Sequence, residues 1–237
     1  MRITHIFTAL MGKSIAACLL FGLATSVSYS VPLQNGDEVK ILNRKGFDAY
    51  EDGKLATALR YYKLAATKGD SSAQYNVAVM RIREEVKTPS LRSALKYLES
   101  SAHNGFAPAQ FMLATLFETG DLVGAHRRSI TKSVALHTLA AEQGHPDSAL
   151  AVGTAYFLGR GTEQNYTKAL SYYLKSADAG DSAAQYLVAS MYESGTGIKK
   201  DLESALQWYV TAARQGDVAA REKSKYLTEL IAKEKRL

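Results

Sequence analysis

Residues 169–180 read ALSYYLKSADAG, and the same twelve-residue pattern occurs four more times along the chain. The other copies are ALRYYKLAATKG at 58–69, ALKYLESSAHNG at 94–105, SVALHTLAAEQG at 133–144 and ALQWYVTAARQG at 205–216. Successive copies begin 36, 39, 36 and 36 residues apart. A repeat of this period indicates an array of stacked structural units, each too small to bury its own apolar face.

A second pattern precedes the last four copies of the first. It reads AQYNVAVMR at 73–81, AQFMLATLF at 109–117, SALAVGTAY at 148–156 and AQYLVASMY at 184–192. The repeating unit is therefore a first helix (helix A), a loop, a second helix (helix B) and a closing glycine. The closing glycine favours a positive φ and so ends helix B without strain.

Spacing within the two helices predicts how they pack. In helix B, Ala58, Tyr61, Tyr62 and Ala65 recur at intervals of three to four residues and so share one face. Helix A carries a small residue at equivalent positions in every copy, namely Ala78, Ala114, Gly153 and Ala189. Small residues allow the helices to approach closely, and the aromatic rings fill the space between them.

The loops and aromatic pairs resemble those of a known family. Glycine pairs follow helix A in two copies, as Gly159-Arg160-Gly161 and Gly195-Thr196-Gly197, and aromatic pairs stand at 61–62, 172–173 and 208–209. With these motifs the chain resembles the Sel1-like repeat, a relative of the tetratricopeptide repeat. The resemblance implies an all-α, right-handed superhelical solenoid of antiparallel helix pairs without a β-sheet.

The resemblance covers about residues 40–220. We expect five units, followed by a polar helix that caps the stack; the units lie at about 40–69, 70–105, 106–144, 145–180 and 181–216, and the cap at 217–237. Two loops depart from the family pattern. Arg83, Glu84 and Glu85 replace the loop glycines of the second unit, and the third unit keeps only Gly120 and gains three residues. These two loops are expected to be less regular.

The first 30 residues have the pattern of a secretory signal peptide. Arg2 and Lys13 are followed by an uncharged stretch at 14–31 whose apolar part is too short for a comfortable membrane span, and small residues follow it. We expect cleavage between Ala24 and Ser30, then a linker at 31–39, with an uncleaved anchor as the alternative. The prediction is a periplasmic or secreted protein without a transmembrane segment after cleavage.

Net charge and cysteine content exclude some classes of partner and site. The chain has 237 residues, one cysteine, 46% hydrophobic residues and a net charge of +6, which falls to +4 without Arg2 and Lys13. This charge is too small to indicate a nucleic-acid partner, and a single cysteine permits no intramolecular disulfide and no Cys-based zinc site. The sequence therefore favours a folded, exported protein that needs no oxidative folding.

No motif in the sequence predicts catalysis. Ser93-Ala94-Leu95-Lys96 matches the Ser-x-x-Lys motif of β-lactamases, but the other motifs of those enzymes are absent and the same phrase opens an ordinary helix B at Ser204. The histidines lack metal-ligand spacing. We therefore predict no catalytic, cofactor or metal residues, and keep a cell-wall or β-lactam-active hydrolase as an alternative function.

The predicted function is binding of a protein partner on the concave face that the A helices form. By resemblance to tetratricopeptide units, a row of aromatic, hydroxyl and carboxylate side chains faces inward there: Tyr75, Phe111, Thr115, Glu118, Leu150, Thr154, Phe157, Tyr186, Ser190 and Glu193. Such side chains suit an extended or helical peptide, while packing between repeats is the alternative role of the aromatic ones. A basic loop edge is the second candidate, for an anionic glycan, and comprises Arg81, Arg83, Arg127 and Arg128.

Overall fold

The computed structural model describes residues 35–83, 85, 90–120 and 128–235. The predicted signal peptide at 1–30 lies outside the described residues. Those residues form eleven α-helices, labelled α2 to α12, and none of them is in a β-strand. The expected all-α architecture of antiparallel helix pairs is therefore confirmed. The chain divides into two compact units, at 1–90 and 91–237.

The described residues of the first unit form three helices. They are α2 (Asn35–Glu51), α3 (Leu55–Thr67) and α4 (Ser71–Ile82), and α3 packs on both of the others. Because α2 begins at Asn35, residues 35–39 of the predicted linker are helical. Asp37 and Glu38 lie in the first turn of α2, where carboxylates interact favourably with the helix dipole.

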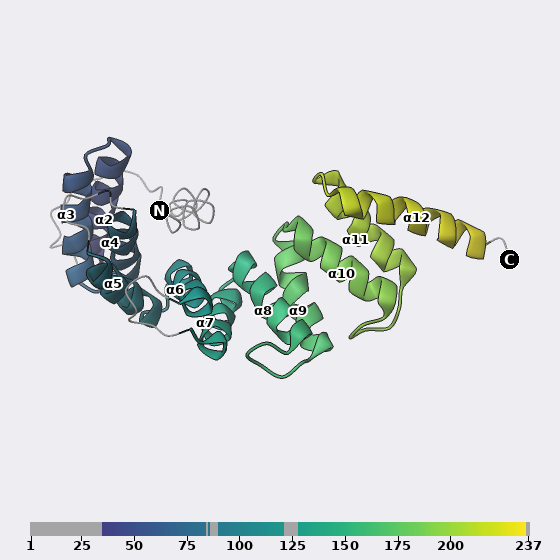
Figure 1. Ribbon diagram of the computed structural model, residues 1–237. Helices are drawn as coiled ribbons and strands as arrows, with labels where there is room; N and C mark the ends of the chain where they lie inside the picture. Colours follow the sequence, from purple (N-terminus) through teal and green to yellow (C-terminus); the bar gives the residue numbers. More distant parts are fainter. Residues whose placement is uncertain (1–34, 84, 86–89, 121–127, 236–237) are drawn as a thin grey trace. The chain divides into compact units, whose positions relative to one another are not determined.

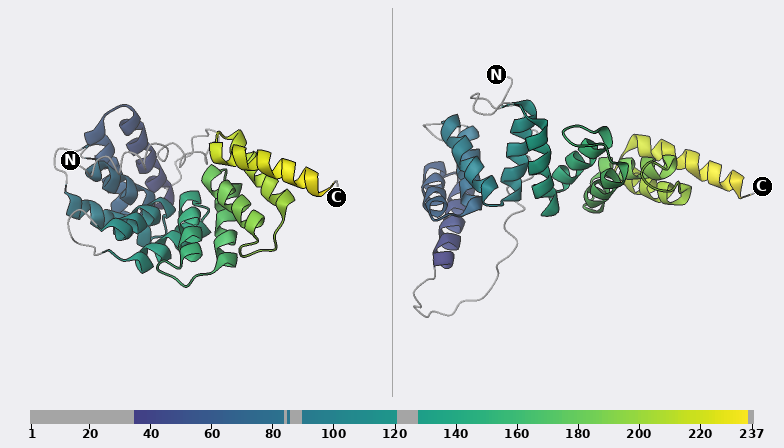
Figure 2. Two further views of the ribbon diagram at one scale, coloured as in Figure 1. Left: turned by 45° about the vertical axis from the view of Figure 1, so that its right-hand side comes forward. Right: turned by 90° about the horizontal axis from the view of Figure 1, so that it is seen from below.

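In the second unit, the residues that the structure describes form eight helices that pack in chain order (Figures 1 and 2). Their bounds are α5 (Leu91–His103), α6 (Ala107–Thr119), α7 (Ile130–Glu142), α8 (Pro146–Leu158), α9 (Tyr166–Asp178), α10 (Ser182–Ser194), α11 (Leu202–Arg214) and α12 (Val218–Glu234). The pairs α6/α7, α8/α9 and α10/α11 lie side by side in Figure 1. Each helix packs mainly on its neighbours in sequence, as in other solenoids.

Close approach of paired helices depends on the small residue in helix A. A Cβ added to Gly153 of α8 would lie 2.5 Å from the ring of Tyr173 in α9, and one added to Gly46 of α2 would lie 2.7 Å from the ring of Tyr62 in α3. Both tyrosines are buried. In these two pairs the aromatic ring therefore occupies the space left by the glycine, as the sequence predicts.

Loops and caps follow the same plan in successive repeats. Asp181 accepts a hydrogen bond from the backbone N–H of Ala184 at 2.7 Å and so caps α10, and Asp217 caps α12 in the same way. Gly197 has a φ of 73°, and a Cβ there would lie 2.6 Å from the backbone of Tyr166. The glycine therefore lets the loop after α10 pack against the first residue of α9.

Helix α12 has one buried face and one exposed face. Ala220, Leu227 and Ile231 are buried, whereas Lys225 and Tyr226 are exposed. Lys225 stands where α10 has the small residue Ala189, eight residues after its capping aspartate. Among the described residues no helix is both long and apolar enough to cross a bilayer.

Candidate protein-binding surface

The residues predicted to face inward lie on four A helices. In the second unit they form one trio on each of three helices, spaced so that each trio shares a helix face: Phe111, Thr115 and Glu118 on α6, Leu150, Thr154 and Phe157 on α8, and Tyr186, Ser190 and Glu193 on α10. We call these nine residues the A-helix row. Tyr75 lies on α4 in the first unit and is buried there, with 8% of its surface exposed.

Around α6, the A-helix row meets two histidines. Phe111 stacks on His145 with ring centroids 4.6 Å apart and makes a tilted contact with His137 at 5.5 Å. Nδ1 of buried His137 lies 3.2 Å from Oγ of Ser148, and its Nε2 lies 3.8 Å from a carboxylate oxygen of exposed Glu118. Phe111 is therefore one wall of a histidine cluster that joins α6, α7 and α8.

Burial controls the charge of both histidines. Burial and the nearby charge of His145 lower the pKa of His137 to about 4. Burial also lowers the pKa of His145, and the carboxylate of Asp147 opposes that shift. Both imidazoles are therefore neutral near pH 7, where they act as packing and hydrogen-bonding groups.

On α8, the row is tied to the following helix. The hydroxyl of Thr154 donates to the carbonyl of Leu150 at 3.0 Å and accepts from the hydroxyl of Tyr173 at 3.2 Å. Phe157 is half-buried and packs edge-on against Tyr166 with centroids 5.2 Å apart. On α6, Thr115 likewise donates to the carbonyl of Phe111. These two threonines use their hydroxyl donors within their own helices.

On α10, the row is tied to the helices that follow it. Glu193 accepts hydrogen bonds from the hydroxyl of Tyr209 at 2.7 Å and from the ammonium of Lys223 at 2.8 Å. Burial raises the pKa of Glu193, but hydrogen bonds from Lys223 and Tyr209 and the charge of Lys223 outweigh it, so the pKa lies below its usual value. Tyr186 packs edge-on against Tyr209 at 5.2 Å, and Ser190 is half-buried.

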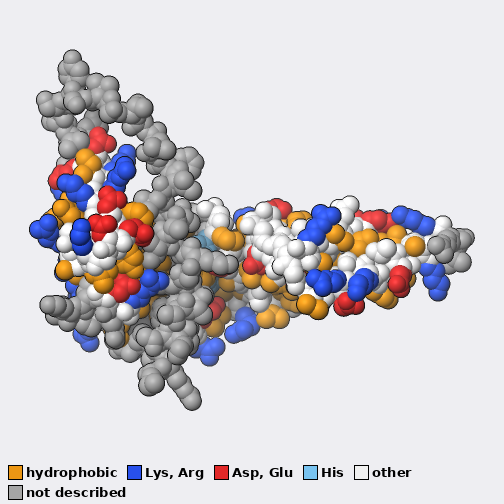
Figure 3. Space-filling model, turned by 90° about the horizontal axis from the view of Figure 1, so that it is seen from above, with side chains coloured by type: hydrophobic (Ala, Val, Ile, Leu, Met, Phe, Trp, Pro, Cys, Tyr) orange, Lys and Arg blue, Asp and Glu red, His pale blue; other side chains and the backbone are white. Residues whose placement is uncertain are grey.

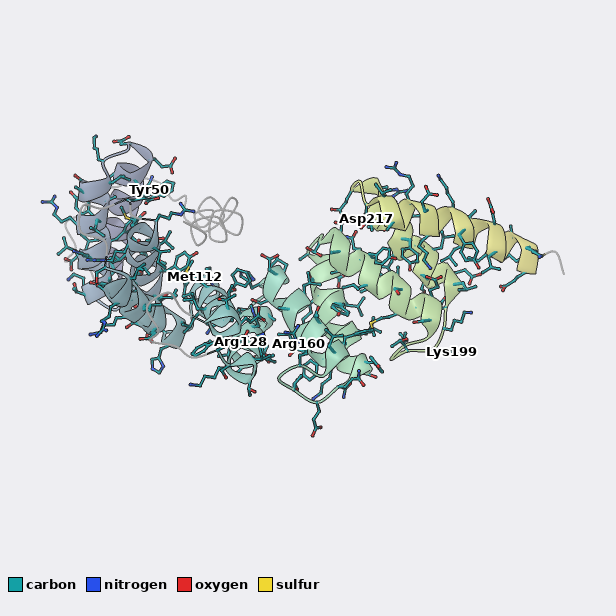
Figure 4. All side chains as sticks on the ribbon, in the orientation of Figure 1. Tyr50, Met112, Arg128, Arg160, Lys199 and Asp217 are labelled. Atoms are coloured by element: carbon teal, nitrogen blue, oxygen red, sulfur yellow. The ribbon has the colours of Figure 1, made fainter. Side chains whose placement is uncertain are left out.

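The residues of the predicted basic edge are divided between the two units of the chain. Arg83 lies 3.6 Å from the carboxylate of Glu85 and 3.5 Å from the hydroxyl of Tyr50, and Arg81 is half-buried on α4. These residues belong to the first unit, whereas exposed Arg128 belongs to the second (Figure 4), and Arg127 lies outside the described residues. On the face shown in Figure 3, blue and red side chains are interspersed.

Buried glutamines are a feature that the sequence analysis missed. Nε2 of Gln110 donates to the carbonyl of Ala102 in the preceding helix at 3.2 Å, and Gln185 donates to Ala177 at 3.1 Å. Each glutamine also accepts from a second amide at the end of the following helix, Gln143 or Gln215. The signal was the AQ dipeptide of the second pattern, where a polar residue recurs inside an apolar phrase.

An apolar groove of about 730 Å³ lies between α5 and α7, over α6. We call it the α5–α7 groove. Its walls include Ala102, Leu113, Phe117, Lys132, Leu136 and Leu139. On α6 these residues lie on the side away from Phe111, Thr115 and Glu118, since each residue turns the helix by about 100°. The groove is therefore distinct from the A-helix row.

The described residues bring together no metal site: no group of three or more His, Cys, Asp and Glu side chains gathers as it would around an ion. Ser93 and Lys96, the pair noted in the sequence, both lie on α5. Within each unit, the described helices pack on their neighbours in sequence, which defines the class of helical repeat proteins.

The chain belongs to the Sel1 repeat family. Five Sel1 repeats match in succession, and we number them from the first to the fifth: residues 46–70, 71–106, 107–145, 146–181 and 182–217. These bounds differ by about one residue from the predicted units, apart from the later start of the first repeat. The second repeat has α4 in the first unit and α5 in the second.

Two solved structures share the fold. The Sel1 repeat protein from Oxalobacter formigenes is 28% identical, with a TM-score of 0.69 over 75% of this chain and 72% of that one. The protein c5321, a protective antigen present in uropathogenic Escherichia coli strains, is also 28% identical, with a TM-score of 0.70 over 83% of this chain. The match spans 41% of c5321.

A plant protein is similar in sequence over a shorter part of the chain. The F-box protein At1g70590 of Arabidopsis thaliana is 31% identical over 78 residues, which is 33% of this chain. That stretch spans 22% of the F-box protein. The similarity is thus confined to a small part of the plant protein.

Proposed function

We propose that this chain is an exported, non-enzymatic scaffold that binds a partner protein on its A-helix row. Sel1-repeat proteins are generally protein–protein interaction scaffolds. The observation that carries the proposal is the regular repetition: five repeats in register, of which the last three carry the A-helix row on α6, α8 and α10. A repeated face of this kind suits an extended or helical segment.

Exposure indicates which residues of the row are available to a partner. Glu118 is exposed, and Phe157, Tyr186 and Ser190 are half-buried. Thr115 and Thr154 are half-buried and bonded within the protein, and Glu193 is bonded to Lys223 and Tyr209. We infer that a partner contacts the free edges of the aromatic rings and the Glu118 carboxylate. The other polar groups of the row position the helices.

The N-terminal sequence supports an envelope location. Residues 1–30 combine two basic residues, an uncharged apolar stretch and a small-residue region. One structural neighbour, c5321, is a protective antigen of uropathogenic Escherichia coli. We propose that the partner is met in the periplasm or outside the cell. Fractionation with N-terminal sequencing of the purified protein tests this, and the expected result is a periplasmic or secreted form that begins between residues 25 and 31.

Site-specific cross-linking tests the binding face. A photo-reactive amino acid is placed at Glu118, Phe157 or Ser190 on the row, or at exposed control positions on the B helices, Ser171 and Thr211. After irradiation in the producing cells, we expect the same discrete adduct from the row positions and none from the controls. Equal adducts from both sets would show that the partner uses another face. No adduct from any position would contradict the scaffold function.

A further inference from the structure

The α5–α7 groove is open because one aromatic ring is missing from the repeat that forms it. At the fourth position of the helix B pattern, four copies carry a large ring: Tyr61, Tyr97, Tyr172 and Trp208. The third repeat carries Leu136 at this position, and Leu136 lines the groove. The third repeat thus has the smallest side chain of the five at the position that covers the preceding helices.

The two repeats that follow show what the ring does. Tyr172 of α9 packs against the buried cluster of Ala141, Ala149 and Val152 on α7 and α8, and it stacks on Tyr156 with centroids 5.8 Å apart. Trp208 of α11 packs in the same way against the buried cluster that α9 and α10 form. Each ring therefore covers apolar surface of the two helices before its own. Leucine provides less area for this over α5 and α6.

The lysine at the edge of the groove recurs in the fourth repeat. Nζ of Lys132 lies 5.3 Å from the centroid of the Phe117 ring, as Nζ of Lys168 lies 5.2 Å from that of Tyr156. In the described part of the chain, the Lys132 ammonium has no carboxylate within ion-pair distance. Exposed Arg128 precedes the same helix. The α7 edge is therefore basic and complements a carboxylate.

The outer lip of the groove is apolar. Leu139 is 48% exposed and adds apolar surface beside the groove. The equivalent residue in the fourth repeat is Lys175, whose ammonium lies 4.8 Å from the centroid of the Tyr172 ring. In the third repeat, a leucine replaces the lysine and a second leucine replaces the ring. Both changes leave apolar surface exposed where the fourth repeat covers it.

We propose that the α5–α7 groove binds an aromatic side chain of a partner protein, on a segment that carries an acidic residue beside the aromatic one. The incoming ring takes the place that Tyr172 and Trp208 occupy in later repeats. The neighbouring carboxylate pairs with Lys132 at the α7 edge of the groove. This inference rests on the proposed function and adds a second binding surface to the A-helix row.

A defined peptide tests the inference. The probe is acetyl-Gly-Asp-Trp-Leu-Glu-Gly-amide, and the control peptide has alanine in place of tryptophan. Each is titrated into the ¹⁵N-labelled protein at 50 and 300 mM salt. We expect saturable shifts of amide signals in α5, α6 and α7 with the tryptophan peptide, at least tenfold weaker binding of the alanine peptide, and a severalfold loss of affinity at the higher salt.

Variants show whether the ring enters the groove. Leu136→Trp installs the residue that α11 carries at this position, so we expect at least tenfold weaker binding with unchanged helical circular dichroism and melting. Thr211→Trp adds the same ring at an exposed site on α11 and should bind the peptide as the native protein does. Lys132→Glu should weaken binding severalfold and remove most of the salt dependence.

Three outcomes would overturn the inference: no shifts at millimolar peptide, shifts confined to α8–α12, or equal affinity of Leu136→Trp and the native protein. The proposed function is tested separately. A partner cross-linked from the A-helix row, with none of the expected peptide binding, would leave the proposed function standing and remove this inference. Peptide binding in the groove without an adduct from the row would support the groove and contradict the proposed binding on the A-helix row.

Discussion

The third and fourth repeats have the same helical plan but differ in what lies between their helices. In the fourth, Gly153 leaves room for the buried ring of Tyr173. The equivalent positions of the third hold Ala114 and His137, and the preceding residue, Leu136, lines an open groove. The two repeats therefore differ at two adjacent positions of helix B. The third repeat has Leu136 and His137 where the fourth has Tyr172 and Tyr173, so an ionisable side chain and an open apolar groove replace two aromatic contacts.

The largest expected loss of stability comes from a larger side chain at Gly153, which would fill the space beside the Tyr173 ring. Gly153→Val should lower the free energy of unfolding by about 3 kcal/mol, because its Cβ would lie 2.5 Å from the Tyr173 ring and the helix pair must separate. Urea denaturation followed by circular dichroism measures it. The same change at Gly36 of α2, where an added Cβ meets nothing within 4 Å, is the control and should have a much smaller effect.

A double variant sharpens this test. Gly153→Ala combined with Tyr173→His installs the small-residue and ring pair of the third repeat. We expect the double variant to be more stable than the sum of the two single losses predicts, because the smaller ring relieves the clash. Strict additivity would show that the two positions do not interact and would contradict the proposed fit.

The next largest effect is the pH dependence of stability that His137 gives to the third repeat. The folded-state pKa of His137, about 4, lies below the value of about 6.5 for the unfolded chain, so the unfolded state binds more protons between these values. Stability present above pH 6.5 is therefore lost as the pH falls toward 4. We expect a loss of about 2 kcal/mol at pH 4.5 after allowance for Glu118, which favours the charged imidazole.

Denaturant unfolding of the native protein and His137→Phe at pH 7 and pH 4.5 measures this difference. The variant should lose less stability on acidification, and His145 accounts for part of what remains because burial lowers its pKa too. Tyr173→Phe in the fourth repeat is the matched control and should leave the pH dependence unchanged. An identical pH dependence of His137→Phe and the native protein would show that His137 does not titrate in this range.

A smaller effect is expected from the glutamine bridge between repeats. Gln185→Ala removes the donor to the Ala177 carbonyl and the acceptor for Gln215, and it should reduce stability by about 1–2 kcal/mol. Gln207→Ala, at an exposed position on α11, is the control and should change stability by a few tenths of that amount. Thermal melting of both variants compares them, and equal melting temperatures would mean that the buried bridge contributes nothing.

The smallest effect concerns the ion pair of the last helix. Lys223→Met removes one of the two donors to half-buried Glu193, and we expect a loss of up to about 1 kcal/mol at pH 7. Lys225→Met breaks an exposed pair with Glu222 on the same helix and should have almost no effect. If the two variants melt at the same temperature, the Glu193 contact is no stronger than an ordinary surface pair.

Much of the fold could be predicted because the repeat pattern itself encodes it. The small residue in helix A, the ring in helix B and the closing glycine recur in register, and the structure places Gly153 against Tyr173 as expected. The start of α2 was missed because residues 35–39 lie before the first copy of the repeat. A pattern read from repeats carries no information outside them.

The binding row was only partly predictable. Helical spacing identified which residues share a face, but not which later side chains reach that face. Glu193 meets Lys223 from a helix 30 residues further along, and Phe111 meets His145 at the N-cap of α8. Such contacts depend on the packing of successive helices, which the periodicity of a single helix does not give. The groove at Leu136 was visible only by comparing the same position across repeats.

The junction between the third and fourth repeats has one further consequence. Here Ala149 stands where α4, α6 and α10 have a buried glutamine, and His137 contacts Ser148 across the junction instead. In a linear array of repeats, cooperativity of unfolding depends on the weakest nearest-neighbour coupling. Because protonation of one imidazole weakens this coupling, we expect acid to divide the second unit into two segments that unfold independently, with α7 and α8 at the boundary.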